Sequence, residues 1–204
     1  MPALVVFVLV LRQRENSDPV ETVVFDREQI QRLASAEDHI VQNHMASLCY
    51  VKPGSFRRTT LKLVLYLTNL VARVSTKGKL SGLDSLHFAH WALIDDGRRL
   101  LFLTNYDGSW ENYLDDFIDK AALGLTGIWS NTLNFPRTRF LVLGGARDEK
   151  RFKAIARKTQ AYTNVWYSAY PNLTVKGIDN NSAIREDLYR SLGPAETKRW
   201  LQRF

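Results

Sequence analysis

The chain has 204 residues, a formal net charge of +7 and an ordinary hydrophobic content of 45%. This length is sufficient for one domain whose core needs no disulfide. The only cysteine, Cys49, excludes an internal disulfide and a metal site built on several cysteines, and it is typical of a reducing compartment such as the cytoplasm. The positive charge favours acidic partners, such as anionic lipid or nucleic acid.

The N-terminal residues 3–11, ALVVFVLVL, are uninterrupted and apolar, and Arg12 and Arg14 follow. A helix needs about 20 residues to span a bilayer, and the segment has neither the charged start nor the cleavage site of a signal peptide. Three interpretations remain open: a buried strand, the remainder of a longer membrane anchor, or a segment that inserts shallowly into a membrane or a partner. The two arginines suit a cytoplasmic flank. Residues 15–25 are polar and predict a linker, so we separate an N-terminal segment, 1–25, from a domain at 26–190 and a helical tail at 191–204.

Two helices and a strand precede the centre of the chain. Asp26 is the expected N-cap of a helix of about 15 residues. A strand is predicted over 46–51 and a helix over 56–76, whose broad apolar surface indicates that it is well buried. Arg57 and Arg58 fall in the first turn of that helix, where the helix dipole disfavours cations. They therefore either point to water or meet an anion.

The centre of the chain is a predicted β-hairpin. Two apolar runs, 86–94 and 99–105, flank a turn at Asp95, Asp96 and Gly97, in which the glycine can adopt a positive φ. Both faces of the hairpin are largely apolar, which predicts a central position in a sheet that is covered on both sides.

The remaining elements complete an α+β pattern. An amphipathic helix is predicted over 110–123 with Gly124 as its stop, followed by an irregular aromatic segment over 125–136. A strand at 138–143, a basic helix at 148–161, a strand at 165–170 and helices at 179–192 and 194–204 follow. The order β-α-β-β-α-β with an added α-β unit predicts a ferredoxin-like antiparallel sheet with helices on one face. A second sheet, within the chain or in a homo-oligomer, would then cover the other face.

The basic segment 137–158 permits two interpretations. It forms a solvated face, or it docks onto phosphates, onto a partner's acids or onto the acidic helix of this protein in another subunit. The strand order also suits RNA-recognition modules, but their Lys/Arg-Gly-Phe/Tyr-Gly/Ala-Phe run is missing, which makes nucleic acid an unlikely partner.

Several motifs resemble a family of bacterial proteins of unassigned activity over about residues 37–190. They are Asn43-His44-Met45, Lys52-Pro53-Gly54, LHFAHW, TNYDGSWENYLDDFID, IWSNT, GGARDE and WYSAYPNLTV. The usual form of the hairpin motif is His-Phe-Ala-Arg-Trp, so His90 replaces an arginine here, which weakens any anion-binding role at that position. Family members often carry a longer apolar leader, which implies membrane association. The fold implied is similar to the dimeric α+β barrels, which include dye-decolourising peroxidases and chlorite dismutases.

The candidate site is built on His87, His90, Asn105 and Asp107, with Asn43 and His44 nearby. Pairing across the turn places His87 opposite position 105 or 106. His87 is a structural residue bonded to an amide or carboxylate, an acid–base partner of Asp107, or an axial haem ligand with Arg57 and Arg58 on the propionates. A metal site is disfavoured, since His87 and His90 lie on opposite faces of their strand.

The sequence therefore predicts a ligand-binding or assembly domain without catalysis of its own. We expect it to be a homo-oligomer or to bind a protein partner, and to lie in the cytoplasm or at the cytoplasmic face of a membrane. The alternative is a haem-dependent, peroxidase-like enzyme that uses His87.

Overall fold

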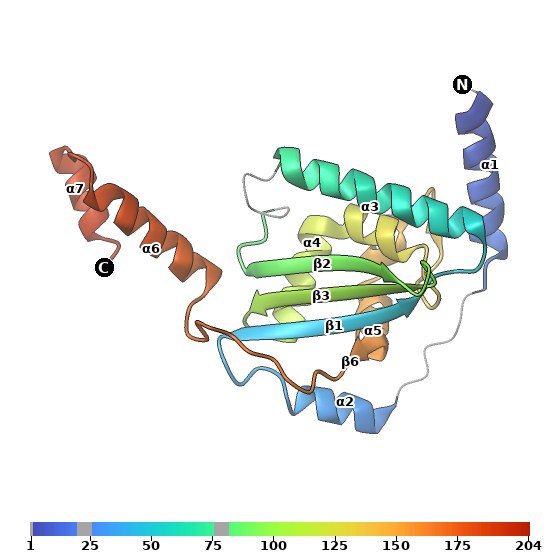
Figure 1. Ribbon diagram of the computed structural model, residues 1–204, viewed down its shortest axis with the longest axis horizontal. Coiled ribbons are helices and arrows are strands. Elements are labelled where there is room, and N and C mark those ends of the chain that lie inside the picture. The colour runs from blue at the N-terminus through green and yellow to red at the C-terminus, as the bar shows by residue number, and fades with distance from the viewer. Residues whose placement is uncertain (1, 20–25, 76–81) are drawn as a thin grey trace.

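The computed structural model describes residues 2–19, 26–75 and 82–204, and Figure 1 shows an α+β arrangement. The helices are α1 (Pro2–Ser17), α2 (Arg27–Ala34), α3 (Ser55–Ser75), α4 (Trp110–Trp129), α5 (Glu149–Thr159), α6 (Val175–Leu188) and α7 (Pro194–Leu201), with a 3₁₀ turn at Gly145–Arg147. The strands are β1 (Gln42–Tyr50), β2 (Leu86–Ile94), β3 (Arg99–Asp107), β4 (Thr138–Arg139), β5 (Leu143–Gly144) and β6 (Gln160–Ala161).

The main sheet has four antiparallel strands in the order β2-β3-β1-β6. The α+β class and the β-α-β-β-α-β order of elements are confirmed, but the fourth strand of the main sheet is β6. The strand expected over 138–143 is instead a separate small hairpin of β4 and β5. Phe140 and Leu141 have φ values of 54° and 65° and reverse the chain there, and this conformation cannot continue a strand. The sheet is open and does not close into a barrel.

Several predicted boundaries are wrong for identifiable reasons. Residues 3–11 form a helix, α1, and not a strand. Gly124 does not stop α4, because Leu125, Ile128 and Trp129 are buried and their packing outweighs the cost of a helical glycine. The expected strand at 165–170 is irregular, and of the predicted linker, residues 20–25 lie outside the described residues.

The core lies between the inner face of the sheet and the helices α3, α4 and α5. Aromatic rings dominate it, and Tyr106 of β3 stacks on Tyr113 of α4 with ring centroids 4.1 Å apart. Phe102 packs against Trp129 at 5.1 Å and against Phe117 at 6.0 Å. The helix predicted over 110–123 therefore presents its apolar stripe to the sheet as its periodicity indicates.

The other face of the sheet, which we call the open face, is not covered by a helix (Figure 1). The prediction that the hairpin is central and covered on both sides is wrong, since β2 is an edge strand. The strand register arranges the open face in four rows across β1, β3 and β2. These rows are His44, Asn105, Phe88; Ala46, Leu103, His90; Leu48, Leu101, Ala92; and Tyr50, Arg99, Ile94.

α3 is also less buried than its sequence predicts. Leu61 points into the core, whereas the side of α3 that faces away from the sheet exposes large apolar residues. Within residues 2–19, 26–75 and 82–204, no helix combines the length and the apolar character that are needed to cross a bilayer.

The C-terminal helices α6 and α7 form an arm that projects from one end of the sheet (Figure 1). Neither helix has a buried residue. Trp200 of α7 donates from its indole Nε1 to the carbonyl of Ile184 in α6 at 3.1 Å, so the two helices contact each other.

Gly145 is required by the packing of the 3₁₀ turn against α4. A Cβ atom there would lie 2.5 Å from Thr126 Cγ2 and 2.8 Å from Phe135 Cε1, and the φ of +62° is unfavourable for other residues. We expect Gly145→Ala to lower the free energy of unfolding by about 2 to 3 kcal/mol. Urea denaturation measures this loss, with Gly124→Ala as the control, because a Cβ at Gly124 meets nothing within 4 Å. Equal stability of the two variants would contradict the assignment.

Candidate functional site

His87 lies at an irregularity in the β2–β3 hairpin. Leu86 pairs with Tyr106 and Phe88 with Asn105, so His87 has no residue opposite it and forms a β-bulge. A bulge re-aims the side chain that it carries. The imidazole Nε2 lies 2.7 Å from Asp107 Oδ1, and the predicted cross-strand neighbour Asn105 is not its partner.

Asp107 joins three segments of the chain. Its Oδ1 contacts His87, and its Oδ2 accepts a hydrogen bond of 2.7 Å from the backbone N–H of Val175, the first residue of α6. Its own backbone N–H donates to the carbonyl of Ser85. The side chains of His87 and Asp107 are only 5% and 11% exposed. The pair therefore works as a latch that fixes the root of the C-terminal arm, and we call it the His87–Asp107 latch.

A second set of contacts secures the segment that leads to the arm. Gln42 donates from Nε2 to the carbonyls of Tyr170 and Leu173, at 2.9 and 2.6 Å, and accepts from Ser168 Oγ at 2.7 Å. The sequence prediction did not include Gln42. A buried glutamine at the start of a strand gives no local signal of a contact about 130 residues away, so only the tertiary structure reveals it.

Trp166 reaches from the same segment onto the end of the open face. Its ring stacks on His44 with centroids 4.8 Å apart. In the amide orientation that satisfies both of its polar atoms, Asn105 accepts a hydrogen bond from Trp166 Nε1 at 3.1 Å. Burial lowers the pKa of His44 below its ordinary value, because desolvation disfavours the charged imidazolium. His44 and Asn105 therefore belong to the rim of the open face.

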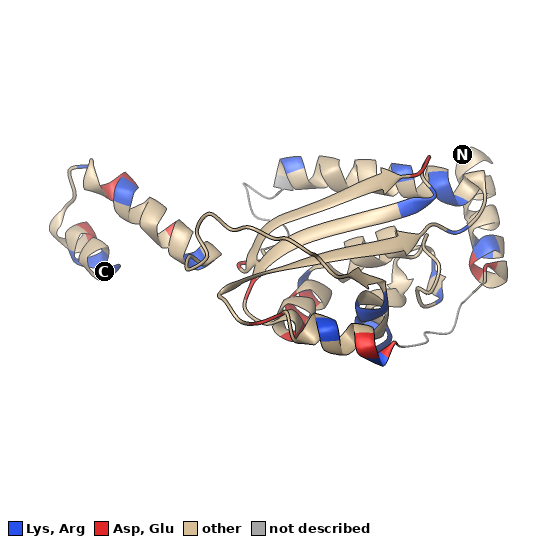
Figure 2. Ribbon diagram, turned by 60° about the horizontal axis from the view of Figure 1, so that its bottom comes forward, with Lys and Arg blue, Asp and Glu red and all other residues tan. Residues whose placement is uncertain are grey.

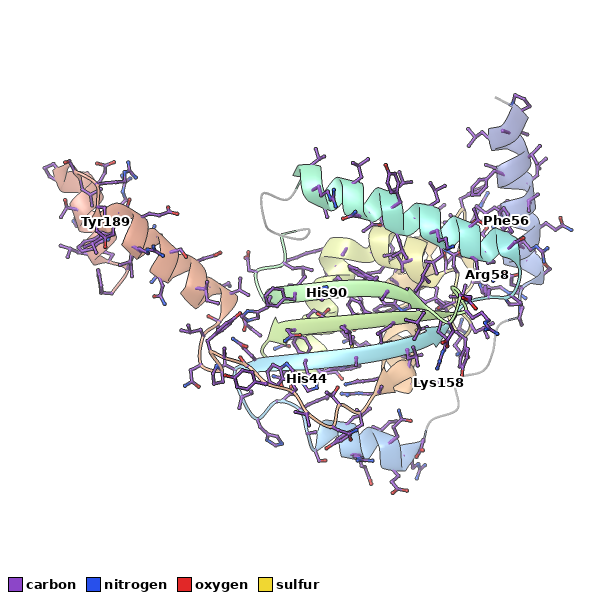
Figure 3. The ribbon with its side chains drawn as sticks, viewed as in Figure 1. His44, Phe56, Arg58, His90, Lys158 and Tyr189 are labelled. Atoms are coloured by element: carbon purple, nitrogen blue, oxygen red, sulfur yellow. The ribbon has the colours of Figure 1, made fainter. Side chains whose placement is uncertain are left out.

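The other predicted site residues lie elsewhere. His90 is exposed on the open face, and Figure 3 shows it on β2, with His44 two strands away on β1. Asn43 is buried and donates from Nδ2 to the carbonyl of Gly108 at 2.9 Å. Arg58 lies at the turn end of the hairpin, with its Cδ 3.7 Å from the position of a Cβ on Gly97. β2 separates Arg58 from His87 by roughly 25 Å at 3.3 Å per residue.

Arg57 is almost fully buried, and it meets an anion of its own chain. Its Nε donates to Asp18 Oδ2 at 2.7 Å, and its Nη1 donates to Asn131 Oδ1 at 3.3 Å. Nη2 also lies 2.7 Å from Asp18 Oδ2 as a charge contact, but at an angle that makes no hydrogen bond. Lys52 adds a second cation, with Nζ 3.9 Å from Asp18 Oδ2 and bonded to the carbonyl of Ser130 at 2.9 Å.

Glu15 completes this buried polar cluster on α1. Its carboxylate accepts hydrogen bonds from Thr138 Oγ1 and from the backbone N–H groups of Phe140 and Leu141. The chain between α1 and α2 resembled a linker in sequence, and neither Glu15 nor Asp18 was predicted as a functional or structural residue. The partner of Asp18 is Arg57, 39 positions later, and the partners of Glu15 lie more than 120 positions later.

The basic helix α5 docks on the acidic helix α4 of the same chain. Lys153 Nζ lies 2.5 Å from Asp115 Oδ1 and 3.2 Å from Glu111 Oε2, in addition to Glu149 in its own helix. Desolvation acts to lower the pKa of Lys153, but its bonds to Asp115, Glu149 and Glu111 outweigh desolvation and raise the pKa above its ordinary value. The acidic helix predicted as a partner in another subunit is therefore contacted within the chain.

The site residues do not fit a haem ligand set. The imidazole Nε2 of His87 already contacts the carboxylate of Asp107, and Arg57 is paired with Asp18. Arg58 lies at the far end of β2 and cannot reach propionates beside His87. A groove of about 550 Å³ runs between α3 and β2, with both His87 and His90 in its lining. Among the described residues, no group of three or more histidine, cysteine or acidic side chains is placed to hold a metal ion.

Comparisons with protein-family models, with curated protein sequences and with solved structures found no significant match to this chain. The family resemblance of the hairpin and WYSAYP motifs therefore stays a prediction.

The His87–Asp107 latch predicts the behaviour of the C-terminal arm. Asp107→Asn removes the charge that faces His87 and leaves one oxygen for two donors, so a buried donor loses its partner. We expect a loss of about 1 to 3 kcal/mol in stability and faster proteolytic cleavage in the segment 167–175. Limited proteolysis followed by mass spectrometry of the fragments measures this. Asp96→Asn is the control, since that carboxylate is 91% exposed, and equal cleavage of both variants would contradict the latch.

Lys52 predicts a pH dependence of stability. Desolvation and the charge of Arg57 lower its pKa to about 8 in the folded protein, despite Asp18, from an ordinary 10.5. Between about pH 8 and pH 10.5 the unfolded chain binds more protons at Lys52 than the folded protein does. The contribution of Lys52 to the free energy of unfolding therefore increases as the pH rises. Lys52→Met should remove about 2 kcal/mol of this increase between about pH 8 and about pH 9.5.

Urea denaturation of the wild type and the variant at both pH values measures the difference. Burial raises the pKa of Cys49, Tyr106 and Tyr113, so these groups lower stability as the pH rises, Cys49 from about pH 9, but this contribution is common to both proteins. Lys62→Met changes an exposed lysine and serves as the control. An unchanged pH dependence in Lys52→Met would show that the ammonium is not desolvated in the folded state.

Proposed function

We propose that this chain is an assembly domain, without catalysis of its own, that binds a second copy of itself through the open face of its sheet. The observation that carries the proposal is the apolar character of that face. Leu103 is 41% exposed at the centre of β3, and Phe88 is 53% exposed near the start of β2. The solvated face of an antiparallel sheet is normally polar, whereas a large exposed apolar surface marks a site of association.

The distribution of polarity on the open face favours a second copy as the occupant. Its two middle rows are apolar apart from His90, whereas the polar residues His44, Asn105 and Arg99 lie in the outer rows. A two-fold axis that lies parallel to the face, over its centre, places the apolar rows of one copy on those of the other. The polar rows then lie at the rim, where they keep contact with water.

The ends of the open face suit a rim. Arg99 at one end is paired with Asp95 of the β2–β3 turn. At the other end Trp166 covers His44 and bonds to Asn105. Two sheets that pack face to face lie about 10 Å apart, which gives the paired-sheet arrangement expected of an α+β barrel dimer.

We place this assembly in the cytoplasm or at the cytoplasmic face of a membrane. The buried free thiol of Cys49 and the net charge of +7 support that location.

Haem binding through His87 is the competing function, and the groove beside β2 is the observation in its favour. The burial of Arg57 against Asp18 and the distance of Arg58 from His87 argue against it. An absorption spectrum of the protein purified from haem-supplied cells distinguishes the two functions. A Soret band that disappears in His87→Ala would overturn the assembly-only proposal.

The open face predicts the mass of the protein in solution. The wild type should elute as a dimer in size-exclusion chromatography with light scattering. Leu103→Glu places a charge in the apolar centre of the face, where its desolvation is unfavourable. We expect a dissociation constant at least about tenfold higher, with the variant monomeric at micromolar concentration.

Leu143→Glu is the matched control, because this leucine is half exposed but lies on β5, away from the open face. It should leave the dimer intact. Circular dichroism checks that both variants are folded. A monomeric wild type, or a Leu103→Glu variant that remains dimeric, would exclude the open face as the contact between copies.

A further inference from the structure

We propose that the outer side of α3 and the N-terminal part of α1 form a surface that binds an anionic phospholipid membrane. Six large apolar residues lie on one side of α3 and are 48–78% exposed: Leu63, Tyr66, Leu67, Leu70, Val71 and Val74. Their spacing of i, i+3, i+4, i+7, i+8 and i+11 makes one continuous row along the helix. We call this row the α3 stripe. It goes beyond self-association and uses a different surface.

The first half of α1 extends this surface. Leu4, Val5, Val6 and Leu9 are 57–64% exposed. Phe7 of α1 packs on Phe56 of α3 with ring centroids 5.5 Å apart, so the two helices contact each other where α3 begins. Figure 1 shows both on the same side of the domain, beyond the β2 edge of the sheet. The buried pair of Asp18 and Arg57 fixes the attachment of α1 at this junction.

A groove continues the α3 stripe towards α4. Its volume is about 600 Å³, and Leu67 and Val71 of the stripe line it together with Leu123, Phe140 and Val142. These last three residues are also among the exposed apolar residues of the domain. The apolar surface is therefore wider than one helix and is shaped to receive flexible apolar groups such as acyl chains.

The charge on α3 selects an anionic surface. The helix contains no acidic residue, and Arg58, Lys62 and Arg73 lie along it at half-exposed or exposed positions. Figure 2 shows basic positions towards both ends of α3 and acidic positions in the β2–β3 turn near its start. The two carboxylates of that turn pair with arginines, Asp95 with Arg99 and Asp96 with Arg98, so they do not neutralise α3.

An apolar stripe flanked by basic residues is the pattern of helices that lie in the plane of a membrane interface. Each basic residue near an anionic surface adds attraction that falls with ionic strength. A protein partner would more often be met by aromatic and hydrogen-bonding groups mixed into the patch. On the α3 stripe only Tyr66 carries a polar atom. The inference rests on the proposed location at a membrane face but not on the open-face dimer.

Co-sedimentation of the full chain with sucrose-loaded vesicles tests the proposal. We expect binding to phosphatidylcholine vesicles that contain phosphatidylglycerol, weaker binding to phosphatidylcholine alone, and a loss of this preference at high salt. The double variant Leu67→Glu, Val71→Glu should bind at least about tenfold more weakly. Lys62→Glu with Arg73→Glu should remove the anionic preference, by roughly fivefold for each charge.

Leu103→Glu, on the open face, is the control. It should bind vesicles as a monomer, which separates failure of this proposal from failure of the dimer. Thermal unfolding followed by circular dichroism confirms that each variant is folded. The proposal is overturned if the wild type binds neither vesicle or if Leu67→Glu, Val71→Glu binds like the wild type. It is also overturned if that variant changes the mass of the protein in solution, because a second copy would then occupy the α3 stripe.

Discussion

The buried ion pair between Asp18 and Arg57 determines how the N-terminal helix is held on the domain. Arg57 is 1% exposed, and an isolated guanidinium could not be buried at that position because its desolvation is too costly. Asp18 supplies the charge and Asn131 supplies a second acceptor, so α1, α3 and the end of α4 must assemble together. Removing one member of such a pair is more damaging than replacing both, since the remaining charge is left unpaired. The pair thereby holds an exposed apolar helix at a fixed place beside the α3 stripe.

The same principle operates at the opposite end of the sheet, where Asp107 holds the C-terminal arm. A carboxylate with several donors fixes each appendage: Glu15 and Asp18 for α1, and Asp107 for α6. The appendages themselves contribute few or no buried side chains. Their positions therefore depend more on charge-assisted hydrogen bonds than on apolar packing, to which α1 contributes Leu11 and the contact of Phe7 with Phe56. This arrangement leaves the open face and the α3 stripe uncovered, with polar anchors at the ends of the sheet and apolar surfaces between them.

Sequence patterns predicted the local features of the fold well. The bounds of β2, the turn at Gly97, the cap at Asp26 and the start of α4 depend on neighbouring residues, and all are confirmed. The bulge at His87 could not be predicted, since alternation alone places that residue opposite position 105 or 106. Arg57 was expected to meet an anion or water, but its partner lay in a segment that resembled a linker. The prediction that α3 is well buried is wrong, because a helix that is apolar on most sides is typical of a protein core. An interaction surface produces the same sequence pattern, so exposure has to be observed.

The two proposed surfaces constrain each other if both operate in one dimer. α3 lies beyond the β2 edge of the sheet (Figure 1), and its residues Leu65, Thr68 and Ala72 line the groove with β2. The α3 stripe lies on the opposite side of the helix, so it faces sideways from the sheet and not along the normal of the open face. A two-fold axis in the plane between the two sheets can run across the strands or along them. An axis across the strands brings both α3 stripes to the same side, where one flat membrane binds both. An axis along the strands directs them to opposite sides, where the dimer would bridge two membranes. The first arrangement lets the second stripe bind at a high effective concentration, so the dimer should bind vesicles more tightly than the Leu103→Glu monomer does. Vesicle aggregation by the wild type, without tighter binding to single vesicles, would indicate the second.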